Sequence, residues 1–227
     1  MSPLELGEWL PIYDEICRDF DFDKAKDLES ARLLASMVGG QGDRILEGVR
    51  KGLPGTVLIC GGSQKLAEEL SSISVEGYVV AADGATTVLM EAGVRVDMIV
   101  TDLDGIIEDQ IESNAKGAPV FLHAHGDNQA VLKRWTSLFS GPVVGTCQCP
   151  PPPGIFNFGG FTDGDRAACL CAGLGARTIR LSGFDFENPS EKPGKDREVK
   201  KQKLQWAKRI IDRLSSQGIR VVRASEQ

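Results

Sequence analysis

Short apolar runs alternate with helix-like segments along most of the chain, and this alternation constrains the fold more than any other feature. Parallel strands buried on both faces read as continuous apolar runs, and they need helical crossovers of this length. The pattern predicts an α/β fold with a three-layer, Rossmann-like, mostly parallel sheet. The expected strands are 56–60, 78–82, 98–100, 119–122, 143–145, 178–182 and 220–222, and the expected helices are 64–73, 86–92, 109–116, 128–138, 165–172 and 199–216.

The first fifty residues have a different pattern. Leu6, Leu10 and Tyr13 recur at helical spacing, and residues 33–38 form a second helix-like segment before a pair of glycines. We therefore predict an N-terminal helical cap, residues 1–52, and an α/β catalytic domain, residues 53–227.

Composition restricts the class of protein. The net charge of −6 argues against nucleic-acid binding, which needs a clustered basic face. The apolar runs are strand-sized, far below the roughly 20 residues of a membrane span, and the N-terminus lacks a basic leader followed by an apolar stretch. We expect a cytoplasmic protein that contacts no membrane. The six cysteines include no Cys-x-x-Cys pair and are expected to be reduced, structural thiols.

Ligands of open α/β sheets bind beyond the carboxyl ends of the strands, so the residues that follow each strand are the candidates for a site. The first strand runs into Gly61, Gly62 and Ser63 and then a helix. Glycines allow close backbone approach, and Ser63 could cap the helix, so this turn is a candidate phosphate cradle. An ordinary strand-to-helix turn explains the same residues.

Aspartates follow the next two strands. The second strand ends at Asp83 and Gly84, and the third at Asp102, Leu103 and Asp104. Magnesium takes hard oxygen ligands, usually one or two carboxylates completed by water and phosphates. Asp-Gly pairs are also ordinary turn residues, but clustered carboxylates repel one another unless a cation lies among them. We predict metal or ribose binding here.

The fourth strand is followed by His123, His125, Asp127 and Asn128. Two histidines and an aspartate could ligate zinc, although the chain has no third histidine and no open zinc-site spacing. The alternative role of Asp127 is the N-cap of a helix beginning at Asn128.

Paired glycines between two phenylalanines form the next motif. Phe158, Gly159, Gly160 and Phe161 could let a flat ring or a phosphate approach the backbone, and Thr162 or Asp163 could begin the following helix. Either phenylalanine could equally belong to the core. The sixth strand adds the carboxylate of Asp185.

A basic segment, residues 189–203, follows that strand. It contains Lys195 and Lys200, and it could form a cationic lid over phosphates. Such charge runs are also typical of a solvated helix face.

Together these strings resemble known families. Ala82-Asp83-Gly84-Ala85 and Thr101-Asp102-Leu103-Asp104-Gly105 resemble the catalytic domain of thiamin pyrophosphokinases. Adding the strings 123–128, 159–166 and 183–186 makes the chain similar to the archaeal MptE-like 6-hydroxymethyl-7,8-dihydropterin pyrophosphokinases over roughly residues 50–215. Thiamin pyrophosphokinases carry a C-terminal all-β domain, whereas this chain ends soon after Val222, so a pterin is the expected acceptor.

The resemblance implies Mg²⁺-dependent transfer of diphosphate from ATP to the hydroxymethyl group of the pterin, releasing AMP, in the biosynthesis of folate-like pterin cofactors. It also implies a homodimer. On this hypothesis the residues take the following roles: Asp102, Asp104 and Asp83 bind the metal; Asp104, Asp127 and Asp163 are catalytic; Gly61, Gly62, Ser63, Asp83, Gly84, Arg166, Lys195 and Lys200 bind nucleotide; His125, Asn128, Phe158, Gly159, Gly160, Phe161, Thr162 and Asp185 bind the pterin.

Other functions remain compatible with the residues alone. A glycosyltransferase-like enzyme could use similar Asp-x-Asp metal chemistry with a nucleotide sugar. A sensor could bind nucleotide or pterin without turnover. AMP release from ATP would separate these alternatives from diphosphate transfer.

Overall fold

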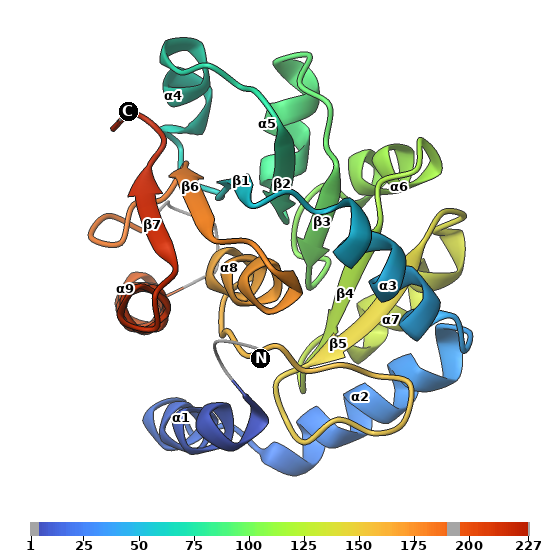
Figure 1. Ribbon diagram of the computed structural model, residues 1–227. Coiled ribbons are helices and arrows are strands. Elements are labelled where there is room, and N and C mark those ends of the chain that lie inside the picture. The colour runs from blue at the N-terminus through green and yellow to red at the C-terminus, as the bar shows by residue number, and fades with distance from the viewer. Residues whose placement is uncertain (1–4, 190–195, 227) are drawn as a thin grey trace.

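The computed structural model describes residues 5–189 and 196–226, and it forms one seven-stranded parallel sheet (Figure 1). The strands are β1 (Thr56–Cys60), β2 (Tyr78–Ala82), β3 (Met98–Thr101), β4 (Val120–Ala124), β5 (Val143–Cys147), β6 (Thr178–Ser182) and β7 (Arg220–Arg223). Their order across the sheet is β5-β4-β3-β2-β1-β6-β7, and every neighbouring pair is parallel. The α/β class and parallel sheet predicted from the sequence are confirmed.

Helices cover both faces of the sheet. They are α1 (Leu6–Phe20), α2 (Lys24–Met37), α3 (Gly42–Gly52), α4 (Leu66–Ser72), α5 (Ala85–Glu91), α6 (Ile107–Ala115), α7 (Gln129–Trp135), the 3-10 turn η1 (Thr136–Leu138), α8 (Asp163–Leu174) and α9 (Arg197–Ser216). In Figure 1, α3, α8 and α9 lie on one face and α4 to α7 on the other. Right-handed crossovers explain this split, because the chain steps from β1 to β5 in one direction and then returns to β6 and β7 in the other.

The order of the strands reverses between β1 and β6. The connection from β5 to β6 passes back over the sheet, and its helix α8 packs against β1, β2 and β3. Such a switch point leaves a crevice at the carboxyl ends of the strands. The N-terminus of α8 therefore lies beside the ends of β2 and β3, although it follows them by some sixty residues or more in the sequence.

Most element boundaries agree with the sequence pattern to within a few residues. The cap contains a third helix, α3, that the pattern did not predict. Gly39 and Gly40 were expected to end the second helical segment, and α3 begins shortly after them, at Gly42. Packing against β5 stabilises this helix.

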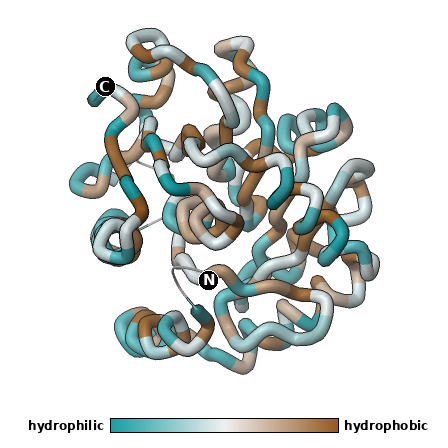
Figure 2. The backbone as a smooth tube through the Cα atoms, viewed as in Figure 1, coloured by the Kyte–Doolittle hydropathy of each residue, from teal (hydrophilic) through white to brown (hydrophobic). Residues whose placement is uncertain are grey.

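Apolar side chains of the strands form the core together with side chains of the cap. Figure 2 shows the hydrophobic segments concentrated in the central strands. Trp9 and Tyr13 of α1 are buried as completely as Ile59 and Phe121 of the sheet, and all four belong to one hydrophobic cluster. All six cysteines are buried free thiols.

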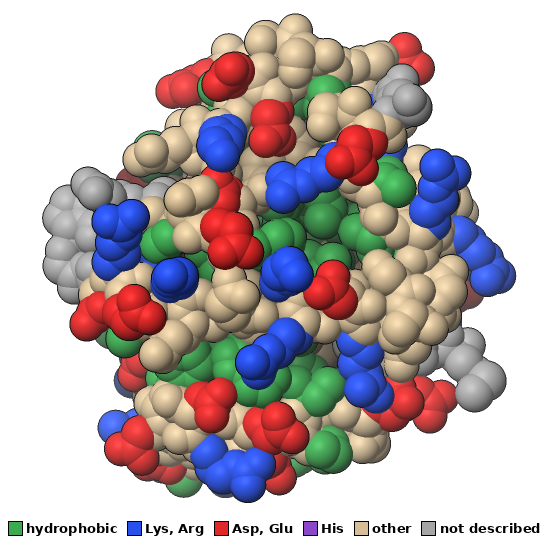
Figure 3. Space-filling model, turned by 90° about the vertical axis from the view of Figure 1, so that its left-hand side faces the viewer, with side chains coloured by type: hydrophobic (Ala, Val, Ile, Leu, Met, Phe, Trp, Pro, Cys, Tyr) green, Lys and Arg blue, Asp and Glu red, His purple; other side chains and the backbone are tan. Residues whose placement is uncertain are grey.

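The surface in Figure 3 carries both signs of charge. Lys and Arg side chains alternate with Asp and Glu, and hydrophobic side chains line a hollow near the centre of this face. No helix among residues 5–189 and 196–226 is long and apolar enough to cross a bilayer.

A buried carboxylate joins the cap to the sheet. Asp27 of α2 is only 3% exposed, and it accepts hydrogen bonds from the Tyr13 hydroxyl, the Gln148 amide and the backbone N–H of Gly126, each at 2.7 Å. Gln148 is also tied to α1, because its carbonyl accepts a 2.7 Å hydrogen bond from the Trp9 indole. Gly126 and Gln148 follow β4 and β5, so this network fixes the cap against the carboxyl edge of the sheet.

We expect Asp27→Ala to lower the free energy of unfolding by about 2–4 kcal/mol, because three donors, two of them in buried contacts, lose their acceptor. Asp23→Ala is the matched control. Asp23 caps α2 through the backbone N–H of Ala25, an exposed contact whose loss costs about 1 kcal/mol. Urea unfolding of both variants measures the difference, and equal losses would contradict the anchoring role of Asp27.

Candidate active site

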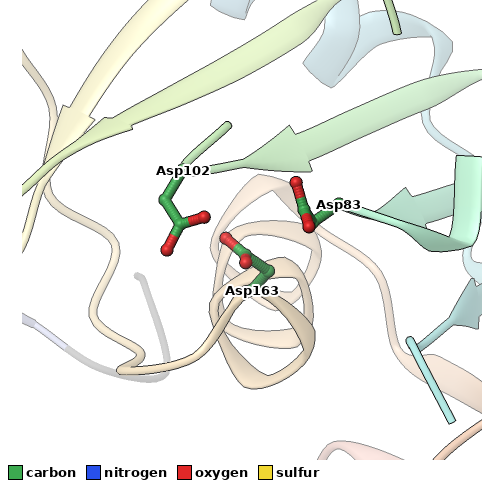
Figure 4. A group of neighbouring side chains, drawn as sticks. All are labelled: Asp83, Asp102 and Asp163. Atoms are coloured by element: carbon green, nitrogen blue, oxygen red, sulfur yellow. The ribbon is translucent and has the colours of Figure 1, made fainter. Parts of the chain in front are cut away.

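Three carboxylates meet at the carboxyl edge of the sheet. Asp83 follows β2, Asp102 follows β3, and Asp163 is the first residue of α8. One oxygen from each lies within 4.8 Å of the others (Figure 4). We call this group the carboxylate cluster.

The turns that carry the cluster have unusual backbone geometry. Asp83 has φ of 46° and Leu103 has φ of 67°, a left-handed conformation that costs a residue with a side chain about 1–3 kcal/mol. Gly105 packs against Asp83 so closely that an added Cβ would lie 2.9 Å from its Oδ2 atom. Strain of this kind is concentrated at functional sites, where surrounding contacts hold it in place.

Three donors fix the orientation of the Asp83 carboxylate. Its Oδ1 atom accepts hydrogen bonds from the Thr101 hydroxyl at 2.7 Å, the Gln110 amide at 3.0 Å and the Gly105 N–H at 3.1 Å. Thr101 and Gln110 are fully buried. The side chain is therefore held before any ligand binds, as a preorganised metal site requires.

Arg166 holds the third carboxylate. Its guanidinium lies 2.6 Å from Asp163 Oδ1 and donates a 2.7 Å hydrogen bond to the Phe161 carbonyl. Burial, and then the nearby charge of Asp102, raise the pKa of the Asp163 carboxyl well above its usual range despite the opposing effect of Arg166. A bound cation would favour the ionised form of the whole cluster.

A capping box starts helix α8 beside the cluster. Asp165 accepts hydrogen bonds from the backbone N–H groups of Phe161 and Thr162 and from the Thr162 hydroxyl. Gly160, with φ of 93°, approaches the helix so closely that a Cβ there would lie 2.7 Å from the backbone nitrogen of Arg166. Packing therefore requires glycine at position 160, and the capping box of α8 fixes the position of Asp163.

Two clefts flank the cluster. The first, which we call the glycine cleft, has a volume of about 430 Å³ and includes Asp83 and Asp163 in its wall. The second, the aromatic cleft, has a volume of about 250 Å³ and includes Asp102. The cluster therefore lies between two spaces, each able to take part of a substrate pair.

Glycines bring the ends of β1 and β6 together at the glycine cleft. A Cβ on Gly61 would lie 2.7 Å from the Gly183 carbonyl oxygen, and one on Gly183 would lie 2.5 Å from that of Gly61. The Ser63 N–H donates a hydrogen bond to the Gly183 carbonyl. Helix α4 begins only at Leu66, so Ser63 does not occupy the N-cap position that the sequence suggested for it. The N-cap position is occupied by Lys65, because the turn after β1 is longer than the sequence pattern indicated.

Asp185 shapes the far side of the glycine cleft. It pairs with Lys65 at 2.7 Å and accepts hydrogen bonds from the backbone N–H groups of Glu187 and Asn188. The Lys65 contact, followed by these hydrogen bonds, holds the pKa of the Asp185 carboxyl well below its usual range. Asp185 is thus ionised and organises the 185–188 turn.

Residues after β4 organise the aromatic cleft. His125 Nε2 lies 3.4 Å from Asp102 Oδ2, and the buried Asn128 amide donates to the carbonyls of His123 and Asp102. Asn128 therefore ties the end of β4 to the end of β3. It also occupies the N-cap position of α7, so Asp127 does not have the alternative role of capping this helix. Asp127 is exposed and lines the aromatic cleft.

Comparison with known proteins identifies the family. The model of the 6-hydroxymethylpterin diphosphokinase MptE-like family matches residues 34–191, more than half of the chain. The chain belongs to this family. It is 40% identical to a 6-hydroxymethyl-7,8-dihydropterin pyrophosphokinase of Methanothermobacter thermautotrophicus, with 95% of this chain and 97% of the relative covered.

Two further relatives carry the same name. The protein of Pyrococcus furiosus is 36% identical, with 93% of this chain and 94% of the relative covered, and that of Methanocaldococcus jannaschii is 34% identical, with 93% and 96% covered. The similarity to these MptE-like proteins therefore includes the N-terminal cap as well as the sheet.

The structure distributes the predicted site residues of this MptE-like chain between the two clefts. The glycine cleft includes Gly61, Gly62, Ser63, Asp83, Gly84, Thr162, Asp163, Asp185 and Lys200. The aromatic cleft includes Asp102, Asp104, His125, Asp127, Asn128, Phe161 and Arg166. Lys195 lies outside the described residues.

Some predicted residues lie apart from the place expected for them. Asp104, expected as a metal ligand, is exposed and is not part of the carboxylate cluster. Asp163, expected as a catalytic residue and not as a metal ligand, belongs to the cluster. Phe158 and Gly159 line a small interior cavity with His123. His123 is 1% exposed, and burial keeps the pKa of its imidazole well below the usual range. Among the described residues, the group of three or more potential metal ligands consists of Asp83, Asp102 and Asp163 and includes neither histidine.

Several residues of the site were not predicted. Thr101 and Gln110 orient Asp83, Lys65 pairs with Asp185, and Phe22 lines the aromatic cleft. The position of Thr101 directly before Asp102 was a usable signal. Nothing in the local sequence of Gln110, Lys65 or Phe22 indicates these roles.

Proposed function

We propose that the protein is a 6-hydroxymethyl-7,8-dihydropterin pyrophosphokinase, which transfers diphosphate from ATP to the pterin hydroxymethyl group and releases AMP in pterin cofactor biosynthesis. The observation that carries this proposal is the carboxylate cluster between two clefts, in a chain of the MptE-like family. Two substrates that exchange a charged group need such an arrangement, with neutralising charge at their junction.

Mg²⁺ fits the cluster. Asp83, Asp102 and Asp163 supply hard oxygen ligands. Burial, and then the charge of Asp102, raise the pKa of Asp163, and a bound cation would favour its ionised form. When bound, the metal would neutralise phosphate charge and orient the phosphates for in-line displacement.

The glycine cleft suits ATP. Backbone atoms of Gly61, Gly62 and Gly84 form its wall, where the absence of side chains allows phosphates to approach. Lys200 of α9 lies in the same wall and would balance phosphate charge, while Phe184 and Leu204 supply apolar surface for a base.

The aromatic cleft suits the acceptor. Phe161 offers a ring surface, and Asp104 and Asp127 are the carboxylates outside the cluster among the described residues that line this cleft. The acceptor hydroxyl must lose a proton as it attacks the β-phosphorus, so we assign proton acceptance to one of these two aspartates.

Incubation with Mg²⁺, ATP and 6-hydroxymethyl-7,8-dihydropterin, with thiamin as a parallel acceptor, tests the proposal. We expect AMP and diphosphorylated pterin, resolved by chromatography, only when the pterin is present. AMP formation with thiamin but not with the pterin would show that thiamin is the acceptor. No AMP with either would reject diphosphate transfer and direct attention to nucleotide-sugar donors.

A further inference from the structure

The N-terminal cap supplies part of the wall of the aromatic cleft. Phe22, in the turn between α1 and α2, borders both this cleft and an adjoining hollow of about 130 Å³. The two spaces also share His125, Asp127 and Gln148. The two spaces therefore adjoin one another and extend from the carboxylate cluster to the cap.

Phe22 forms an aromatic corner with Phe161. The two ring centroids are 6.2 Å apart, and the ring planes meet at 55°. Phe20 supports both rings from the cap side, with centroids 5.4 Å from Phe22 and 5.3 Å from Phe161. Lys203 Nζ lies 5.6 Å from the centroids of both Phe22 and Phe161. Tilted rings of this kind can offer a face and an edge to a planar ligand.

This corner is the apolar part of a polar cleft. Its neighbours include the exposed carboxylates Asp104 and Asp127, which can hydrogen-bond to the edge of a ring. A flat heteroaromatic molecule with polar edges would match this combination of ring surface and hydrogen-bonding groups. An aliphatic alcohol would use only the polar part.

The cap is held firmly enough to present Phe22 in a defined position. Asp27, five residues after Phe22, is hydrogen-bonded to Gly126 and Gln148, which themselves line the hollow beside the cleft. Asp23, the residue directly after Phe22, caps the N-terminus of α2 by accepting a hydrogen bond from the backbone N–H of Ala25. A preorganised ring loses little entropy when a ligand packs on it.

We propose that Phe22 is a specificity-determining residue, which packs against the bicyclic ring of the acceptor, so that the N-terminal cap forms one wall of the acceptor site. This inference rests on the proposed function, because the pterin is the planar acceptor named there. It goes beyond that function by assigning acceptor recognition to the cap, where the sequence pattern predicted only helices.

Binding and kinetics of Phe22→Ala test the inference. The oxidised and fluorescent compound 6-hydroxymethylpterin serves as the binding probe, and 6-hydroxymethyl-7,8-dihydropterin as the acceptor in the AMP assay. We expect Kd for the probe and KM for the acceptor to rise by about 5-fold to 100-fold, the range expected for losing one ring-stacking contact. KM for ATP should stay close to that of the wild type, and Tm should fall by only a few degrees, because Phe22 also packs on Phe20 and Phe161.

Two further variants separate recognition from folding. Phe22→Tyr keeps the ring and should retain most of the affinity for the probe. Phe156→Ala removes another half-buried phenylalanine, which packs on Gly42 of α3 and lines neither cleft, so it should leave the KM for both substrates unchanged.

Each outcome decides between the inference and the proposed function. If the wild type forms AMP with the pterin but Phe22→Ala binds the probe as tightly, the role of Phe22 is rejected and the function stands. If Phe22→Ala weakened the binding of pterin and of ATP by the same factor and also lowered Tm strongly, Phe22 would have a structural role only. That result would also reject the inference. If the wild type neither binds the probe nor forms AMP, the proposed function fails and this inference fails with it.

Discussion

Asp102→Asn is expected to lower kcat at least about 1000-fold, because a metal at this site contributes several kcal/mol of charge stabilisation to phosphoryl transfer. The asparagine keeps the shape of the side chain but removes one of the three carboxyl groups that meet within 4.8 Å. Fewer like charges repel one another, so the variant should be no less stable than the wild type without Mg²⁺. Steady-state AMP formation measures kcat.

Metal binding to the same variant gives an independent readout. The Tm of the wild type should rise with added MgCl₂, because a ligand that binds only the folded state stabilises it, and the Tm of Asp102→Asn should respond much less. Asp212→Asn is the control, since this exposed carboxylate of α9 contacts only Lys208 at the surface among the ion pairs of the described residues. An Asp102→Asn protein with more than a tenth of the wild-type kcat would contradict metal binding by Asp102.

Gly160→Ala is expected to lower the free energy of unfolding by about 3–5 kcal/mol. The left-handed φ of 93° costs an alanine about 1–3 kcal/mol, and the clash of its Cβ with the backbone of Arg166 adds a similar amount. Relief of the clash would move the start of α8, which carries Asp163. Urea unfolding measures the loss of stability, which is a large fraction of the 5–15 kcal/mol typical of a folded domain.

Gly175→Ala separates strain from crowding. Gly175 ends α8 with φ of 119°, but no atom lies within 4 Å of the position that its Cβ would occupy. This variant should therefore lose only about 1–2 kcal/mol, from backbone strain alone. If Gly160→Ala cost no more than Gly175→Ala, the close approach of residue 160 to Arg166 would have no energetic importance.

The strand ends show what a local pattern can and cannot predict. A strand buried on both faces needs a continuous apolar run, and the residue after it lies at the carboxyl edge of a parallel sheet. This reasoning placed Asp83, Asp102 and Asp185 at one edge, and they lie there. It could not predict the orientation of Asp104. The left-handed Leu103 between Asp102 and Asp104 turns the chain, so residues two apart do not share one face.

Sequence alone therefore determined the parallel α/β sheet and the set of acidic residues along its carboxyl edge, because both follow from periodicities of a few residues. Tertiary structure decided which of these side chains meet. Helix α8 crosses back over the sheet and brings Asp163 to Asp83 and Asp102, and the cap brings Phe22 to Phe161. These contacts join segments separated by some sixty residues or more, and packing of the whole chain, which no local pattern records, creates them.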